Sequence, residues 1–217
     1  MFQLPGRVPM EQRTFQFSQP DGNALTVRLC SPVIRSDVSK YGHYTWKCAE
    51  VLSEHIAKFP ELVRGRRVLE LGSGTGLCGL VAGMCGASFV TFTDSDPTLE
   101  TYLLQSAQEN GIKETVGFRL LDWEHPTHKW RPFEFDLLLA SDTLFEKRVY
   151  EPFLQTAVLL LNSQPEAFML LALEPRGSLT SLSILFRKYF LECTPEDVHY
   201  LRFHSVQLYR VRLKTSV

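Results

Sequence analysis

The sequence has no strong excess of charge of either sign, because 23 lysine and arginine residues nearly balance 24 aspartate and glutamate residues. A net charge of −1 creates no overall positive field, so we expect no direct binding to nucleic acid. The sequence also lacks an uncharged apolar run long enough to span a membrane, and residues 1–15 lack the apolar segment of a secretory signal. These absences predict a soluble protein without a membrane partner.

Cysteine is scarce and shows no pairing pattern. The five cysteines form no C-x-x-C motif, and several lie within apolar runs: Cys30, Cys48, Cys78, Cys85 and Cys193. An odd number of isolated cysteines in apolar surroundings is typical of reduced thiols that serve as small core residues. We therefore expect a cytoplasmic or nuclear protein.

The length of 217 residues and the 44% of hydrophobic residues predict one domain over residues 1–217, which we expect to be a monomer. Residues 1–60 are predicted to form a hairpin, with its turn at residues 20–23, and a helix over residues 44–59. Residues 61–217 are predicted to form the core of the domain.

Strands and helices alternate along this core. Short apolar or β-branched runs predict strands, and longer runs with a helical period predict helices. The predicted strands are 68–71, 88–93, 116–121, 135–140 and 168–173, with a last pair within 199–213, and the predicted helices are 77–85, 97–110, 149–161 and 179–190. This order predicts an α/β fold with a doubly wound, mostly parallel seven-stranded sheet, whose ligands bind at the carboxyl ends of the strands.

A glycine-rich run, Gly72-Ser73-Gly74-Thr75-Gly76, joins the first core strand to the helix over 77–85. Residues without a Cβ allow a strand to turn at once into a helix and leave room for a ligand. The turn also directs backbone N–H groups and the start of a helix toward that ligand. We therefore predict that Gly72, Ser73 and Gly74 bind a cofactor.

Two cofactors compete for this turn. The pattern Gly74-x-Gly76-x-x-Gly79 with Asp94 twenty residues on matches the dinucleotide fingerprint, which is a weak signal by itself. S-adenosylmethionine is favoured by Glu70 two positions before the first glycine, by the dense glycine run and by the long segment before the first core strand.

Acidic residues precede and follow the turn. Asp94 ends the second core strand, where a carboxylate can accept hydrogen bonds from both ribose hydroxyls. The alternative for Asp94 is a helix N-cap, although Ser95 and Asp96 are better placed for that role. For Glu70, direct cofactor contact and hydrogen bonding to the nearby backbone remain two open alternatives.

Polar residues also end the third and fourth core strands. Asp122 and Trp123 are candidates for holding the adenine, although Trp123 could instead cap the core. Ser141 and Asp142 are predicted to lie beside the transferred methyl group, with Asp142 positioning the acceptor and Phe145 lining its channel. The alternative for Asp142 is a helix cap.

A metal site is not expected. His125 and His128 form an H-x-x-H pair, but they lie in a predicted loop without a third ligand nearby.

The combination of these motifs resembles the seven-strand protein methyltransferases of the methyltransferase-like 21 group. The resemblance covers residues 41–173 and rests on Tyr44-Thr45-Trp46, ELGSGTGL, Thr93-Asp94, Leu121-Asp122-Trp123 and Asp142-x-x-Phe145. It implies the Rossmann-like methyltransferase fold, S-adenosylmethionine as cofactor and a protein substrate. It also implies cofactor contacts from Trp46, Gly72 to Gly74, Asp94, Trp123 and Ser141, and it assigns Asp142 and Phe145 to the D-x-x-Y/F motif of the group.

The acceptor residue stays open between lysine and arginine. The stretches YGHYTWKCAEVL and LASDTLFE resemble a member of the group linked to histone arginine methylation. However, the sequence has no obvious pair of glutamates to clamp a guanidinium, and Asp142 with Glu146 is the nearest substitute. The alternatives are a methyltransferase for a small molecule or a nucleic acid, a catalytically weak binding module that acts in protein assembly, and an NAD-linked oxidoreductase.

Overall fold

The computed structural model describes residues 10–33, 41–125, 134–162, 164–175, 179–197 and 203–214. Seven strands form one sheet in the order β5-β4-β3-β6-β7-β9-β8. Five of them are parallel: β3 (Arg67–Leu71), β4 (Phe89–Asp94), β5 (Val116–Leu120), β6 (Leu137–Ser141) and β7 (Phe168–Leu173). The last strand, β9 (Gln207–Leu213), lies antiparallel between β7 and β8 (Leu191–Pro195). The predicted fold class is therefore confirmed.

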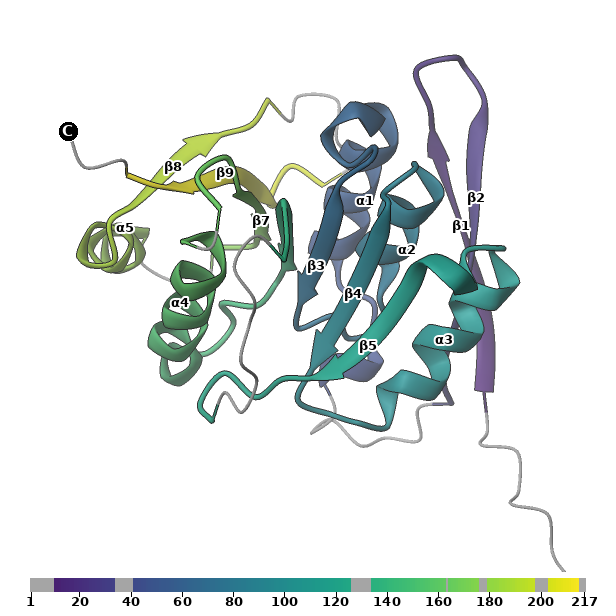
Figure 1. The fold of residues 1–217 in the computed structure, drawn as a ribbon, viewed down its shortest axis with the longest axis horizontal. Coiled ribbons are helices and arrows are strands. Elements are labelled where there is room, and N and C mark those ends of the chain that lie inside the picture. Colours follow the sequence, from purple (N-terminus) through teal and green to yellow (C-terminus); the bar gives the residue numbers. More distant parts are fainter. Residues whose placement is uncertain are drawn as a thin grey trace, which may run out of the picture.

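Helices cover both faces of this sheet, as Figure 1 shows. The helices α1 (Lys47–Lys58), α2 (Leu77–Met84) and α3 (Leu99–Glu109) cover one face, and α4 (Lys147–Leu161) and α5 (Leu179–Lys188) cover the other. Alternate residues of β6 pack against the helices on opposite faces of the sheet. Leu139 packs with α1 and α2, whereas Leu138 packs with α4. Both faces of the sheet are therefore apolar, which explains why the central strands are continuous hydrophobic runs in the sequence.

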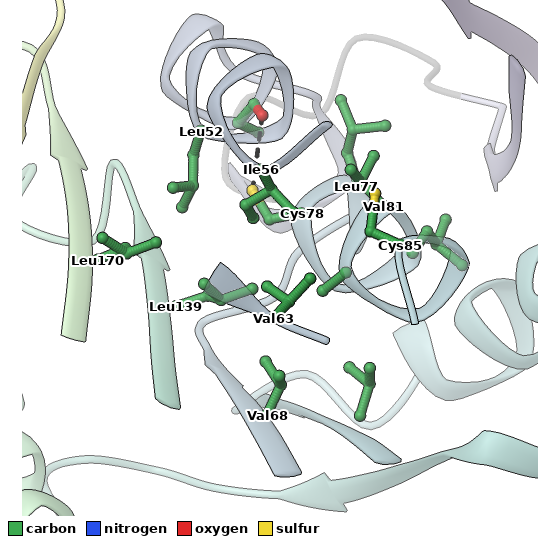
Figure 2. Packing of buried hydrophobic residues seen from close by; sticks show 14 of the residues in the cluster. Leu52, Ile56, Val63, Val68, Leu77, Cys78, Val81, Cys85, Leu139 and Leu170 are labelled. Atoms are coloured by element: carbon green, nitrogen blue, oxygen red, sulfur yellow. Dashed lines mark hydrogen bonds between the residues drawn. The ribbon is translucent and has the colours of Figure 1, made fainter. Parts of the chain in front are cut away.

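The layer between the sheet and the first two helices is tightly packed. In Figure 2, Leu139 and Leu170 of the sheet lie on the side that Leu52 of α1 and Val81 of α2 cover. The Cys78 thiol donates a weak hydrogen bond to the carbonyl of Ala49 at 3.5 Å, which joins α2 to α1.

The predicted N-terminal hairpin is confirmed as β1 (Met10–Ser18) and β2 (Ala24–Pro32). It forms a separate two-stranded sheet that lies against α3 (Figure 1). The side-chain oxygens of Asn110 and Ser106 accept hydrogen bonds from the backbone of Arg28 at 2.9 Å and of Cys30 at 2.8 Å. These hydrogen bonds join the hairpin to the core and support the prediction of a single domain over residues 1–217.

The prediction for the C-terminal strand pair was partly wrong. The second strand of the pair is β9, but its partner β8 lies at Leu191–Pro195, before the predicted range. Phe190 adopts a left-handed backbone with φ of 54°, so the chain reverses directly from α5 into β8 without a connecting loop. The helix consequently ends at Lys188, two residues earlier than predicted.

Among the helices in the described ranges, none is both long and apolar enough to cross a membrane.

Candidate active site

A cavity of about 450 Å³ lies at the carboxyl ends of β3, β4 and β6, where the fold predicts a ligand. Residues from the loop before α1 and from the start of α4 complete its wall. All the predicted site residues except Glu70 line it: Trp46, Gly72, Ser73, Gly74, Asp94, Asp122, Trp123, Ser141, Asp142 and Phe145.

The glycine turn forms the floor of this cavity. Gly72 and Gly74 adopt left-handed conformations with φ of 61° and 51°. A Cβ on Gly72 would meet the Trp123 ring at 3.0 Å, and one on Gly74 would meet the carbonyl oxygen of Gly42 at 3.0 Å. The turn therefore needs glycine at these positions both for its backbone shape and for its close neighbours.

Asp94 is held in place by the backbone around it. One carboxylate oxygen accepts a hydrogen bond from the N–H of Gly74 at 2.9 Å, and the other accepts one from the N–H of Asp96 at 3.1 Å. Burial raises the pKa of Asp94, and these backbone bonds oppose that shift. Asp96 serves the start of α3 by accepting from the backbone and hydroxyl of Thr98, so the N-cap alternative does not apply to Asp94.

Glu70 lies outside the cavity. Its side chain is only 2% exposed, and its carboxylate accepts a hydrogen bond from the backbone N–H of Gly79 at 3.1 Å. Burial raises the pKa of Glu70 to about 8. The sequence left open whether Glu70 contacts the cofactor or the nearby backbone. In the structure Glu70 bonds to the backbone, and this bond joins β3 to α2.

Trp123 both packs against the core and faces the cavity. Its ring lies edge-on to Phe153 with centroids 5.1 Å apart. Its indole N–H is buried and has no hydrogen-bond partner among the described residues. Thr143 is another residue of the cavity wall, and its hydroxyl is likewise buried without a hydrogen-bond partner among the described residues. Buried polar atoms without a partner at a cavity wall indicate a polar ligand.

Asp122 lies at the more open edge of the cavity. Its carboxylate accepts a hydrogen bond from the backbone of Glu124 at 2.9 Å and lies 3.2 Å from the Nδ1 atom of His125. Three side chains are close enough together to hold a metal ion, namely those of Asp122, Glu124 and His125. Two of these three residues, Glu124 and His125, are exposed. His128, the other half of the predicted histidine pair, lies outside the described residues.

Asp142 occupies an unusual backbone conformation after β6. It has φ of 54°, and its N–H donates to the carbonyl of Ala172 at 2.9 Å. The helix that follows starts at Lys147 with Glu146 at its N-cap, so the helix-cap alternative for Asp142 was wrong. A non-glycine residue in this region costs on the order of 1 kcal/mol or more and is concentrated at functional sites.

Two aromatic pairs edge the cavity. Phe145 contacts Tyr41 with ring centroids 5.3 Å apart, and Trp46 contacts Tyr44 at 6.1 Å. The indole N–H of Trp46 donates to the carbonyl oxygen of Tyr41 at 3.0 Å, which joins the two pairs.

Sequence reasoning did not identify several residues of the wall, among them Tyr41, Gly42, Asp96 and Arg148. The first two belong to a 3-10 turn, η1 (Tyr41–His43), which is too short to show a helical period. The concentration of aromatic residues in Tyr41-Gly42-His43-Tyr44-Thr45-Trp46 was the signal that could have identified them.

The donor set fits S-adenosylmethionine. The cofactor needs a hydrogen-bond acceptor for its ribose hydroxyls, room beside a glycine backbone and a pocket for its adenine. Asp94, the turn at Gly72 to Gly74 and the indole of Trp123 supply these features in one cavity.

Comparison with known proteins supports this assignment. Residues 33–186 match the sequence model of a family described as lysine methyltransferase. The chain is 30% identical over 178 residues to the mouse histone-arginine methyltransferase METTL23, covering 80% of this chain and 68% of that protein. It is 29% identical over 188 residues to the mouse protein N-lysine methyltransferase METTL21A, covering 84% of each.

Solved structures agree with the fold. The crystal structure of SMU.776 complexed with SAH, S-adenosylhomocysteine, superposes with a TM-score of 0.62 at 11% identity, over 98% of this chain and 58% of that one. The ribosomal protein L11 methylase from Lactobacillus delbrueckii subsp. bulgaricus gives a TM-score of 0.55 at 18% identity, over 77% and 78% of the two chains. The family model and the curated relatives confirm the predicted methyltransferase activity with its cofactor S-adenosylmethionine, and they confirm the resemblance seen in the sequence. The chain belongs to the lysine methyltransferase family.

Proposed function

We propose that this protein transfers the methyl group of S-adenosylmethionine to a side-chain nitrogen of a protein substrate, lysine or arginine. One observation carries the proposal. The glycine turn with Asp94 and the strand end with Asp142 and Phe145 line the same cavity, so cofactor-binding and acceptor-binding groups share one site.

The cofactor side is made of residues that bind and orient. Asp94 would accept hydrogen bonds from the ribose, and Asp122 and Trp123 would hold the adenine. The remaining contacts would come from Trp46, Gly72, Ser73, Gly74 and Ser141. When bound, S-adenosylmethionine supplies a methyl group that is activated by its attachment to a sulfonium. Glu70 acts from behind the turn, as a positioning residue that fixes α2 against β3.

The acceptor side has to align a nitrogen and leave it unprotonated. A lysine amine is protonated in water at neutral pH and attacks only after it loses that proton. Asp142 would orient the amine through its carboxylate, while the ring of Phe145 excludes water from the aliphatic stem. The strained backbone at Asp142 supports this role, because it directs a carboxylate-bearing residue to the cavity at the end of β6.

The ion pair between Arg148 and Glu146 favours lysine over arginine as the acceptor residue. Arg148 donates to the carboxylate of Glu146 at 2.6 Å, and Glu146 does not line the cavity. Of Asp142 and Glu146, the pair that the sequence offered for clamping a guanidinium, only Asp142 lines the cavity. Arginine is kept as the second candidate because METTL23, one of the relatives, is named a histone-arginine methyltransferase.

The test is calorimetric titration with S-adenosylhomocysteine. Wild-type protein should bind it, and Asp94→Ala should bind it on the order of 100-fold more weakly, because hydrogen bonds to a charged group are lost. NAD should give no binding. Lysine-containing and arginine-containing peptides would then be screened for methyl transfer. Failure of the wild-type protein to bind S-adenosylhomocysteine would refute the proposal and leave a partner-binding module as the better account.

We also propose that the protein acts in the cytoplasm or the nucleus, as a monomer that does not bind nucleic acid. None of the five cysteines forms a disulfide, and four of them are buried, which suits a reducing compartment. The near-neutral net charge of −1 supports the absence of nucleic-acid binding.

A further inference from the structure

The three residues of η1 each contact a different part of the cavity wall. The ring of Tyr41 touches Phe145 after β6, with centroids 5.3 Å apart. The carbonyl of Gly42 lies where a Cβ on Gly74 would meet it at 3.0 Å. The Nε2 atom of His43 lies 3.0 Å from the Asp96 carboxylate after β4. This turn therefore connects the acceptor side of the site to the cofactor side.

The backbone of the turn is fixed, but the ring of Tyr41 is not covered. Its carbonyl accepts hydrogen bonds from the indole of Trp46 at 3.0 Å and from the N–H of Tyr44 at 3.3 Å. His43 is buried, which anchors the other end of the turn. The Tyr41 side chain is nevertheless 46% exposed, although it lines the cavity.

An exposed aromatic ring whose backbone is fixed at the edge of a site is suited to contact a ligand. The ring that Tyr41 contacts is that of Phe145, which belongs to the motif that the sequence assigns to the acceptor. Because the rings of Tyr41 and Phe145 already touch, a bound side chain lies against the surface they share and not between them.

We propose that Tyr41 is an acceptor-binding residue, whose ring forms with Phe145 the apolar surface that holds the aliphatic stem of the side chain being methylated. This inference rests on the proposed function. Tyr41 lies outside the strand-end motifs. We therefore expect the turn η1 to contact the acceptor side chain as well as the cofactor side of the cavity.

The test compares two ligands by calorimetry, so it needs no known protein substrate. The first is S-adenosylhomocysteine, and the second is an analogue that carries an alkylamine chain in place of the transferred methyl group. Tyr41→Ala should bind the first within about 2-fold of wild type but the second roughly 5- to 10-fold more weakly, since aromatic packing on the chain is lost. Tyr41→Phe should behave as wild type with both ligands, because the ring and not the hydroxyl is required.

Phe89→Ala is the matched control. Phe89 is also an aromatic residue with a similar exposure of 40%, but it lies at the start of β4 and does not line the cavity. Its substitution should leave both affinities unchanged, and thermal melts of all variants would show that they fold.

The outcomes separate the two proposals. Wild-type protein that binds neither ligand would overturn the proposed function and this inference with it. Wild-type protein that binds both, with Tyr41→Ala weakening both equally or neither, would overturn only the role of Tyr41.

Discussion

On the cofactor side of the cavity, Asp94 is oriented by backbone N–H groups of Gly74 and Asp96, whereas on the acceptor side Phe145 is in contact with the half-exposed ring of Tyr41. The first arrangement depends on the path of the main chain through a buried turn. The second depends on side chains that solvent reaches. Changes on the cofactor side should therefore disturb folding and cofactor binding together, while changes on the acceptor side should affect turnover with little effect on either.

The largest effect is expected at Asp142, on the acceptor side. Asp142→Asn and Asp142→Gly should each lower the rate of methyl transfer on the order of 100-fold or more, because the carboxylate that orients the amine is removed. Both should bind S-adenosylhomocysteine as wild type does. Asp142→Gly should also raise the free energy of unfolding by up to about 1 kcal/mol, because glycine adopts φ of 54° without strain.

Kinetics, calorimetry and thermal melts would measure these three quantities in parallel. A loss of S-adenosylhomocysteine affinity that matches the loss of rate would contradict this prediction and assign Asp142 to the cofactor side.

The next effect is expected at Gly74, on the cofactor side. Gly74→Ala should weaken S-adenosylhomocysteine binding on the order of 100-fold, because its new Cβ would press on the Gly42 carbonyl and displace the turn. Gly22→Ala is the matched control. Gly22 is also left-handed, with φ of 84°, but it has no atom within 4 Å of the added Cβ.

Both variants should lose about 1–2 kcal/mol of unfolding free energy from the backbone conformation alone. Only Gly74→Ala should lose affinity in calorimetry. Equal affinities in the two variants would mean that the turn tolerates displacement and that the cofactor side is not set by its main chain.

The effect expected at Glu70, behind the turn, is on the pH dependence of stability and not on turnover or affinity. Its pKa of about 8 in the folded protein lies above its ordinary value of 4.5, so the folded state holds the proton more tightly than the unfolded state does. This contribution to stability is fully present below about pH 4.5 and is lost as the pH rises through about 8.

Glu70→Gln stays neutral at every pH and keeps an oxygen for the Gly79 N–H. Relative to this variant, wild-type protein should therefore lose stability from about pH 4.5 to about pH 8, by a few kcal/mol at most. Urea unfolding of both proteins across this range measures the difference. A constant difference would show that the pKa of Glu70 is the same in the folded and unfolded states.

The residues predicted for the cofactor side, other than Glu70, line one cavity, and their signals in the sequence are local. The glycine run, Asp94 and Asp122-Trp123 each follow directly after a predicted strand, and the carboxyl ends of parallel strands meet at one edge. The position of Glu70 was also accessible from the two-residue period of β3. Leu69 and Leu71 pack on the side of α4, so Glu70 points with Val68 toward α2.

The acceptor side was less accessible from the sequence. Tyr41 reaches Phe145 across more than a hundred residues of sequence, and no local pattern encodes that contact. β8 was missed for a different reason, because a single left-handed residue, Phe190, replaces the loop that usually separates a helix from a strand. Both failures occur where tertiary contact or one unusual backbone angle decides the structure.

The position of β9 has a consequence for the order of assembly during synthesis. β9 lies between β7 and β8, although it follows both in the chain. Until residues 207–213 leave the ribosome, β8 has no strand to pair with and the edge of β7 remains open. The central strands and the glycine turn can form earlier, since domains are synthesised from the N-terminus. The nascent chain therefore exposes the apolar edge of β7 while residues 174–213 are synthesised, and chaperones can bind it during that interval.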